Sequence, residues 1–201
     1  FKNLEFKNDL RTQAYDLTPY DETLMLDSDY IIANDLFKEC FTSDHNFQIY
    51  KDAKDLSGFR EVAEFKNISE TSVDFYWATV VYFKKCKEVE TYFNLTKHIQ
   101  ENWQHYNSIF QINKGTFRND WVFSIAIHIM NGYQHGDFAT PLPGTKYFTT
   151  DRDILWELDK ENFLFLIEKK DHLGEYTPLR IKGSNVHVMN KFSLTRIIDN
   201  E

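Results

Sequence analysis

The sequence is poor in the residues that interrupt or cross-link a chain. Only 7 Gly, 4 Pro and 2 Cys occur among 201 residues. Cys40 and Cys86 are too few for a disulfide framework and too far apart for a paired-cysteine metal motif, so we expect a reducing compartment. No repeat or low-complexity tract interrupts the chain. Together these absences predict a single domain over residues 1–201.

Long apolar runs and excess positive charge are also missing. No apolar stretch approaches the ~20 residues of a membrane-spanning helix, so we expect no membrane contact and a cytoplasmic location. The net charge of −8 disfavours a general nucleic-acid surface, although a local basic patch is compatible with it. The chain has instead 18 Phe, 11 Tyr and 42% hydrophobic residues, ample material for a large core.

Three common catalytic signatures are absent. The chain has no Walker-type phosphate loop, no G-x-G-x-x-G fingerprint and no G-x-S-x-G nucleophile elbow. ATPase, Rossmann dehydrogenase and α/β-hydrolase functions therefore lack support.

Helical and strand periodicities alternate along the chain, which predicts an α/β fold. Residues 44–72 are polar, show no clear pattern and are expected to include a mobile excursion. Residues 136–152 contain Gly, Pro and Thr and suggest a surface loop. The elements that we expect are a helix over 8–16, a strand ending at Asp27, a short strand over 30–33, a helix capped by Asn34 or Asp35 and ending at Phe41, a strand over 73–83, helices over 87–104 and 119–130, and strands over 163–167 and 185–189.

The most informative segment is residues 23–30, Thr-Leu-Met-Leu-Asp-Ser-Asp-Tyr. We expect a buried strand that ends in Asp27 and Asp29, whose side chains leave on the same side because directions alternate along a strand. Two such carboxylates repel each other and lose hydration unless a cation lies between them. Carboxylate oxygens favour Mg²⁺ or Mn²⁺, which favours a phosphorylated substrate. The alternative is a helix N-cap and a turn aspartate.

His187 is a candidate for a third metal ligand. It lies in residues 185–191, Asn-Val-His-Val-Met-Asn-Lys, near the end of a late predicted strand. A neutral imidazole there can complete a site begun by two carboxylates. We expect most other histidines to be surface or core residues, including His128, which lies mid-helix among Ile and Met.

Residues 17–30, Leu-Thr-Pro-Tyr-Asp-Glu-Thr-Leu-Met-Leu-Asp-Ser-Asp-Tyr, resemble the segment that leads into the D-x-D motif of GT-A fold glycosyltransferases, especially those encoded by large tailed phages. The resemblance extends to residues 118–128 and 186–191. It implies a mixed sheet flanked by helices and a metal-dependent transfer of a hexose or pentose. The donor would be a nucleotide-diphosphate sugar and the acceptor a hydroxyl, such as that of a hydroxymethylated base in phage DNA, in the host cytoplasm.

The resemblance also implies roles for individual residues. In the glycogenin-like class two aspartates and a late histidine hold Mn²⁺ (or Mg²⁺), which makes Asp27, Asp29 and His187 the metal ligands. Arg11 takes the place of an arginine that reaches the donor. Asp120 takes the place of an aspartate that holds donor-sugar hydroxyls beside the reacting carbon, and the late histidine favours retention of configuration.

The sequence departs from the glycogenin-like pattern at three points. Lys191, matched to a lysine that contacts the diphosphate, follows the histidine by four residues instead of six, and no glycine intervenes. The donor-sugar strand falls near residues 77–79, where the match is poor. The first βαβ unit, which grips the nucleotide base in this class, has no counterpart, so we expect an N-terminal base-binding part to be missing.

Two other functions fit the D-x-D motif. A haloacid dehalogenase-type phosphatase also begins with an apolar strand and D-x-D, although Tyr30-Ile31 stands where its Gly-Thr is expected. A non-catalytic GT-A-like binding module is the second alternative. For the helper residues the plainer interpretations are an exposed helix charge at Arg11, an N-cap at Asp120 and a surface charge at Lys191.

Overall fold

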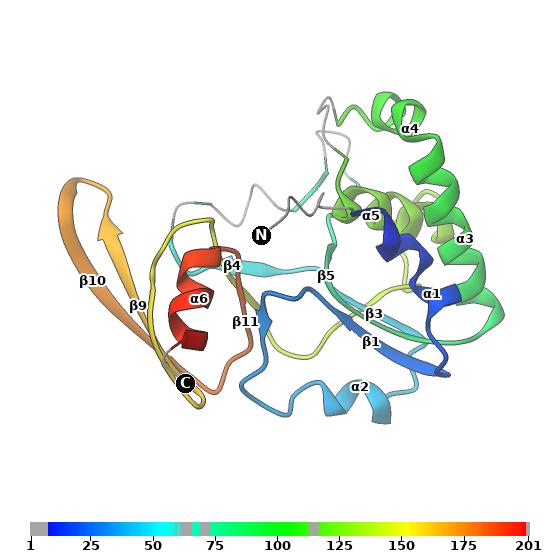
Figure 1. Cartoon of the computed structure of the whole chain (residues 1–201). Coiled ribbons are helices and arrows are strands. Elements are labelled where there is room, and N and C mark those ends of the chain that lie inside the picture. Colours follow the sequence, from blue (N-terminus) through cyan, green and yellow to red (C-terminus); the bar gives the residue numbers. More distant parts are fainter. Residues whose placement is uncertain (1–7, 59, 61–65, 69–72, 113–116, 200–201) are drawn as a thin grey trace.

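The computed structural model describes residues 8–58, 60, 66–68, 73–112 and 117–199 and shows a mixed α/β fold, with mixed sheets flanked by helices (Figure 1). In chain order its elements are η1 (Asn8–Gln13), α1 (Ala14–Leu17), β1 (Glu22–Leu26), β2 (Tyr30–Ile31), α2 (Lys38–Thr42), β3 (Phe47–Tyr50), β4 (Ala53–Asp55), β5 (Trp77–Lys84), α3 (Lys87–Glu101), α4 (Trp103–Ile109), α5 (Asn119–Met130), β6 (Thr140–Pro141), β7 (Lys146–Thr149), β8 (Leu155–Asp159), β9 (Asn162–Lys169), β10 (His172–Lys182), β11 (Val186–Val188) and α6 (Lys191–Asp199).

The described strands form three sheets. One has the order β1-β5-β3-β6, with β5 antiparallel to both of its neighbours. The second has the order β2-β11-β7-β4, in which β11 pairs antiparallel with β2 and parallel with β7. The third, β10-β9-β8, is an antiparallel sheet whose long β9–β10 hairpin projects from the body of the molecule in Figure 1.

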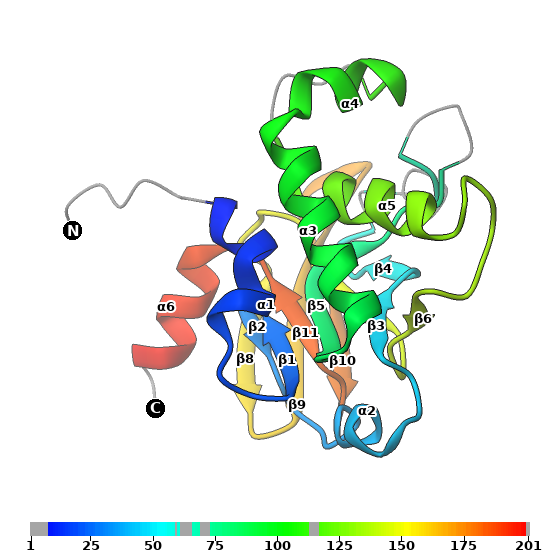
Figure 2. The ribbon, with the colours of Figure 1, turned by 90° about the vertical axis from the view of Figure 1, so that its right-hand side faces the viewer.

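The main core lies between the β5 sheet and helices α3 and α5, which contact each other and run in different directions in Figure 2. Strand β5 is rich in β-branched and aromatic residues and is buried along nearly its whole length. The ring of Phe93 in α3 packs against Phe83 of β5 at 4.8 Å and against Phe123 of α5 at 6.2 Å. The predicted apolar stripe of this helix, from Val89 to Ile99, therefore faces the core as expected.

Several predicted elements are confirmed within one turn of their boundaries. These are the N-terminal helix, which begins as a 3₁₀ turn, the strand before Asp27, the strand within 73–83, the helices at 87–104 and 119–130, and the strands at 163–167 and 185–189. Gly132, with φ 70°, ends α5 in the left-handed conformation that glycine favours. Among the described residues no helix is long and apolar enough to cross a membrane.

One prediction was wrong in kind, because residues 136–152 contain β6 and the buried strand β7 rather than a surface loop. Residues 44–72, which showed no clear pattern, contain β3 and β4. Both β3 and β7 are four residues long and covered on both faces, so they lack the polar alternation of a half-exposed strand. Residues 59, 61–65 and 69–72 of the segment in which we expected a mobile excursion lie outside the described residues.

The helix that we expected from Asn34 or Asp35 begins later, at Lys38. The side chain of Asn34 accepts a hydrogen bond from the Leu36 N–H at 3.0 Å and closes a turn instead of capping a helix. Successive i→i+3 backbone bonds from Lys38, Glu39 and Cys40 then tighten the chain before the short helix α2.

Candidate metal centre

The D-x-D motif forms the turn between β1 and β2, just past the carboxyl end of β1. The Asp27 N–H donates to the Thr79 carbonyl at 3.0 Å and extends the β1–β5 ladder by one residue. The Val188 N–H donates to the Asp29 carbonyl at 2.9 Å. The turn is thereby attached to β5 on one side and to β11 on the other. The preceding strand is half-buried instead of buried, because β1 lies at the edge of its sheet.

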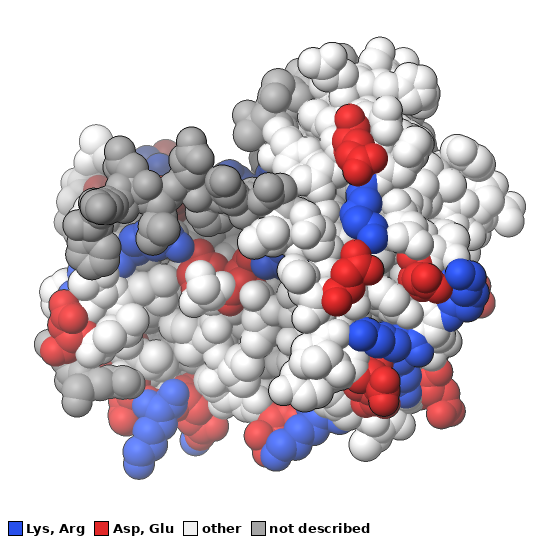
Figure 3. All heavy atoms as spheres, turned by 45° about the vertical axis from the view of Figure 1, so that its right-hand side comes forward, with Lys and Arg blue, Asp and Glu red and all other residues white. Residues whose placement is uncertain are grey.

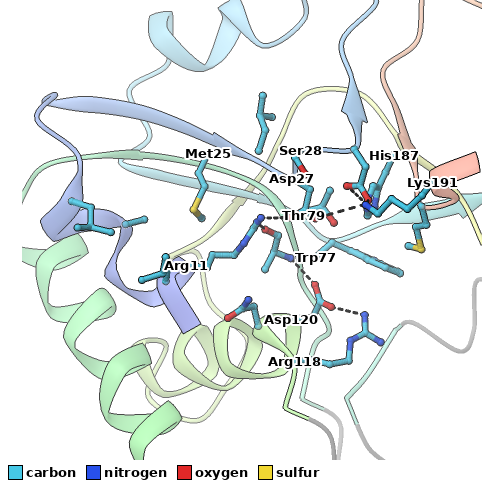
Figure 4. Close-up of a pocket in the computed structure, with 18 residues that line it drawn as sticks. Arg11, Met25, Asp27, Ser28, Trp77, Thr79, Arg118, Asp120, His187 and Lys191 are labelled. Carbon is cyan, nitrogen blue, oxygen red and sulfur yellow. Dashed lines mark hydrogen bonds and ion pairs between the residues drawn. The ribbon is translucent and has the colours of Figure 1, made fainter. Parts of the chain in front are cut away.

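His187 in β11 meets both aspartates of this turn. Its Nε2 atom lies 2.9 Å from Asp29 Oδ1 and 3.8 Å from Asp27 Oδ2, and one ligand atom from each of the three residues lies within 4.8 Å of the others (Figure 4). Two carboxylate oxygens and an imidazole nitrogen are donors suited to Mn²⁺ or Mg²⁺. The cluster can therefore hold a divalent metal ion.

Two cations border the carboxylates. Arg11, from η1, donates to Asp27 Oδ1 and to the Ala78 carbonyl, and its side chain is 14% exposed. Arg11 is therefore a largely covered member of the site and not an exposed helix charge. Lys191, the first residue of α6, donates to Asp29 Oδ2 at 3.1 Å from a side chain that is 67% exposed. Each carboxylate of the motif thus faces one cation.

The two carboxyl groups respond differently to this environment. Burial raises the pKa of Asp27 and outweighs the opposing charge of Arg11. Burial acts in the same direction on Asp29, but the hydrogen bonds and charges of His187 and Lys191 exceed it and lower its pKa to about 2. Asp29 is therefore ionised throughout the physiological range, as a metal ligand must be.

Asp120 lies in the first turn of α5, across the cavity from the motif. Its Oδ1 accepts a hydrogen bond from the Ala78 N–H at 2.9 Å, and its Oδ2 accepts one from Arg118 Nη2 at 2.5 Å. The N-cap interpretation of Asp120 is wrong, because Arg118 occupies the N-cap position and no side chain caps this helix. The carboxylate instead joins α5 to β5 and faces the same cavity as Asp27.

Lys146 is a member of the site that sequence reasoning missed. It begins β7, its exposure is 0%, and its Nζ atom lies 3.2 Å from His187 Nδ1. The ammonium also lies over the rings of Trp77 at 4.8 Å and Phe148 at 5.6 Å. Burial lowers the pKa of Lys146 to about 7, against the attraction of Asp120, Asp27 and Asp29. No sequence signal marked it, since a loop was expected there.

The side chains of the site other than Lys146 line one cavity of about 670 Å³. The polar part contains the aspartates, His187 and the cations, and Figure 3 shows acidic and basic atoms together in a hollow near the middle of this face. The apolar part is formed by Leu10, Leu17 and Met25. Residues 77–79, where the family match is poor, also line the cavity. His128 does not line it and contacts Phe110 and Tyr133 instead.

Comparison of the chain with models of protein families, with curated proteins and with solved structures found no match. The function of the site must therefore be argued from its own side chains. These are two carboxylates and an imidazole within reach of one ion, a third carboxylate opposite them, and cations on both sides.

Proposed function

We propose that the protein is a GT-A type glycosyltransferase that uses Mn²⁺ or Mg²⁺ to transfer a sugar from a nucleotide-diphosphate donor to an acceptor hydroxyl. The observation that carries the proposal is the convergence of Asp27, Asp29 and His187 at one end of a cavity bordered by Arg11 and Lys191. The segments 17–30 and 186–191, which resemble this class, contain Asp27, Asp29, His187 and Lys191. The cavity volume suits a ligand the size of a nucleotide sugar.

Asp27, Asp29 and His187 would hold the metal ion, which would bind the donor diphosphate and neutralise negative charge that develops on it as it departs. Arg11 and Lys191 supply two further positive groups at the same end of the cavity. The guanidinium of Arg11 is suited to bidentate phosphate contacts, whereas the exposed ammonium of Lys191 acts as a movable point charge.

Asp120 is suited to act on the sugar. Transfer breaks the bond between the anomeric carbon and the leaving phosphate oxygen and forms a bond to the acceptor oxygen, so positive charge develops on the sugar. A carboxylate fixed by the Ala78 N–H and Arg118 is preorganised to hold sugar hydroxyls or to stabilise that charge. We assign Asp120 this catalytic role, with retention of configuration.

For the acceptor, the resemblance suggests a hydroxymethylated base in phage DNA. The net charge of −8 opposes a broad electrostatic grip on DNA. Recognition of such an acceptor would therefore depend on the cavity itself, where Arg118 is 38% exposed at the rim.

Calorimetric titration of uridine and guanosine diphosphate sugars, with and without Mn²⁺, tests the proposal. We expect binding of one donor to require the metal and to be lost in Asp29→Asn. Asp44→Asn, an exposed acidic residue outside the cavity, is the matched control and should bind as the wild type does. Absence of binding to every donor by the folded protein would contradict the proposal.

The same preparation separates the two alternatives. A phosphatase of the haloacid dehalogenase type forms a phosphoaspartate at Asp27, which mass spectrometry detects after trapping. A non-catalytic module binds a donor but transfers no sugar to any acceptor tested, and shows no donor hydrolysis. Slow, metal-dependent hydrolysis of the bound donor without a phosphoenzyme would support the transferase.

A further inference from the structure

Lys146 is the most deeply buried charged residue of the site and has few polar partners. Its exposure is 0%, and its side chain forms no ion pair with the described residues. Among them it makes one hydrogen bond, to His187 Nδ1 at 3.2 Å, and the rings of Trp77 and Phe148 cover the head group. A buried polar head group with so few partners destabilises a fold. Packing alone therefore does not explain a lysine here, and such exceptions are typical of functional positions.

Strand register brings the lysine to the imidazole. Strand β7 pairs with β11 so that Phe148 lies opposite His187. Lys146 and Phe148 are two residues apart on β7, so their side chains share one face of the sheet. The Lys146 side chain contacts the Nδ1 side of the His187 ring and does not line the cavity. It can therefore act on a ligand in the cavity only through His187.

The imidazole of His187 is held at both of its ring nitrogens. Nε2 lies 2.9 Å from Asp29 Oδ1, and Nδ1 lies 3.2 Å from Lys146 Nζ. If the ring turned over about its Cβ–Cγ bond, carbon atoms would face both partners and both contacts would be lost. When Nε2 serves as a metal ligand, its lone pair is used for the ion and it cannot donate to Asp29. Among the described residues, the contact with Lys146 is then the remaining hydrogen bond of the ring.

We infer that Lys146 is a positioning residue of the candidate metal centre, because its hydrogen bond to Nδ1 fixes the His187 ring with Nε2 toward Asp27 and Asp29. Metal-binding histidines generally use their second ring nitrogen in such an outer hydrogen bond, most often to a carboxylate, a carbonyl or water. In this chain a buried lysine takes that place.

The contact holds the ring whichever group carries the proton. An ammonium donates to the Nδ1 lone pair, and a neutral amine accepts a hydrogen bond from Nδ1–H. The role of Lys146 rests on the metal centre of the proposed function, but the orientation of the His187 ring can be measured without a metal ion or a donor.

Nuclear magnetic resonance of the whole wild-type chain tests this orientation, first without metal and then with saturating Mg²⁺. Because Hε1 adjoins Nδ1, we expect nuclear Overhauser contacts from the Hε protons of Lys146 to His187 Hε1 and none to His187 Hδ2. A ring that is turned over would bring Hδ2 toward Lys146 instead. The same contacts should persist after Mg²⁺ is added, when the hydrogen bond to Asp29 is lost.

A double-mutant cycle tests whether Lys146 acts through the ring. Lys146→Met removes both the hydrogen bond and the positive charge, whereas His187→Gln keeps a ligand oxygen but has no polar atom at the position of Nδ1. Loss of the charge acts equally in both backgrounds, so the cycle isolates the hydrogen bond. Electron paramagnetic resonance of free Mn²⁺ measures affinity in the wild type, the two single variants and the double variant.

We expect Lys146→Met to weaken Mn²⁺ binding about 10–100-fold more when His187 is present than in the His187→Gln background. A general structural role would weaken binding equally in both. Lys54→Met, at an exposed lysine in β4, is the matched control and should bind Mn²⁺ as the wild type does.

Two results would overturn the inference. One is an equal effect of Lys146→Met in both backgrounds, and the other is a contact from Lys146 to Hδ2 of His187. Because the contacts are measured on the wild type, they can overturn the inference even if Lys146→Met does not fold. Failure of the folded wild type to bind Mn²⁺ or Mg²⁺ would instead contradict the proposed function, and the contacts in the metal-free chain would still decide the orientation of the ring.

Discussion

Replacing Lys146, the buried lysine beside His187, with an uncharged residue should stabilise the protein at pH 6.5 and destabilise it at pH 10. Lys146 ionises with a pKa of about 7 in the folded chain, against an ordinary value of 10.5. Between these values the unfolded chain binds one more proton than the folded chain, so the free energy of unfolding rises with pH over this window. A difference of about 3.5 between the two pKa values corresponds to roughly 5 kcal/mol in total.

Lys146→Met separates this electrostatic cost from packing. Methionine keeps an unbranched chain against Trp77 and Phe148 but leaves His187 Nδ1 without its partner, which costs about 1–3 kcal/mol. At pH 6.5 the charge penalty in the wild type is larger than this loss, so the variant should be more stable by roughly 2–4 kcal/mol. At pH 10 the penalty has largely disappeared, and the variant should be less stable.

Urea unfolding at a series of pH values, in the presence of EDTA, measures this effect. The difference in unfolding free energy between wild type and variant should change by about 4 kcal/mol from pH 6.5 to pH 10. Lys54→Met, at an exposed lysine in β4, is the control and should show a difference that is nearly independent of pH. A constant difference for Lys146→Met would refute the reasoning, because it would mean that Lys146 has the same pKa in both states.

Three further outcomes are expected. Asp120→Asn should lower kcat of sugar transfer by about 10²–10³-fold with little change in metal affinity. Steady-state kinetics and Mn²⁺ titration measure the two quantities, and an unchanged kcat would show that Asp120 has no catalytic role. Hydrogen bonds from Arg196 lower the pKa of Asp153, so Asp153→Asn should lower the free energy of unfolding by about 0.5–1 kcal/mol at pH 7. This cost should shrink as the pH falls through the folded-state pKa of Asp153, and thermal unfolding at a series of pH values measures it. Phe93→Ala should cost about 3–5 kcal/mol in urea unfolding, and a cost below 1 kcal/mol would contradict the packing described between α3, α5 and β5.

Local sequence patterns were sufficient for elements that are long and covered on one side. Helix α3 repeats apolar residues from Val89 to Ile99 at three- and four-residue steps, and only its inner face is buried. Strand β5 concentrates aromatic and β-branched residues over eight positions. In such elements the apolar residues of the sequence pattern are the residues that are buried, so the pattern alone is enough to locate the element.

Short strands inside the molecule do not have this property. Strand β7, Lys-Tyr-Phe-Thr, lies in a stretch whose Gly, Pro and Thr residues suggested a surface loop, yet Lys146, Phe148 and Thr149 are all fully buried. Besides Phe148 of its own strand, the lysine contacts the ring of Trp77 in β5 and the imidazole of His187 in β11, more than thirty residues away in either direction. A window of sequence around Lys146 contains neither of these distant partners, so its burial could not be predicted from it.

The candidate metal centre contains ligands that a local sequence pattern predicts and a ligand that distant strand pairing brings in. Asp27 and Asp29 are neighbours in sequence, so their proximity follows from one strand and one turn. His187 reaches them because β11 pairs Tyr30 with His187 on one side and Phe148 with His187 on the other.

The same register places Lys146 beside His187, since residues two apart on β7 share a face with Phe148. A slip of one residue in β11 would turn the His187 side chain to the opposite face of the sheet and remove both contacts. Pairing between strands that are more than 150 residues apart thus determines whether the three ligand atoms meet, and no local pattern encodes that pairing. His187 was marked by its place near the end of a predicted strand and by the resemblance of residues 186–191 to a known motif, whereas Lys146 had no such signal.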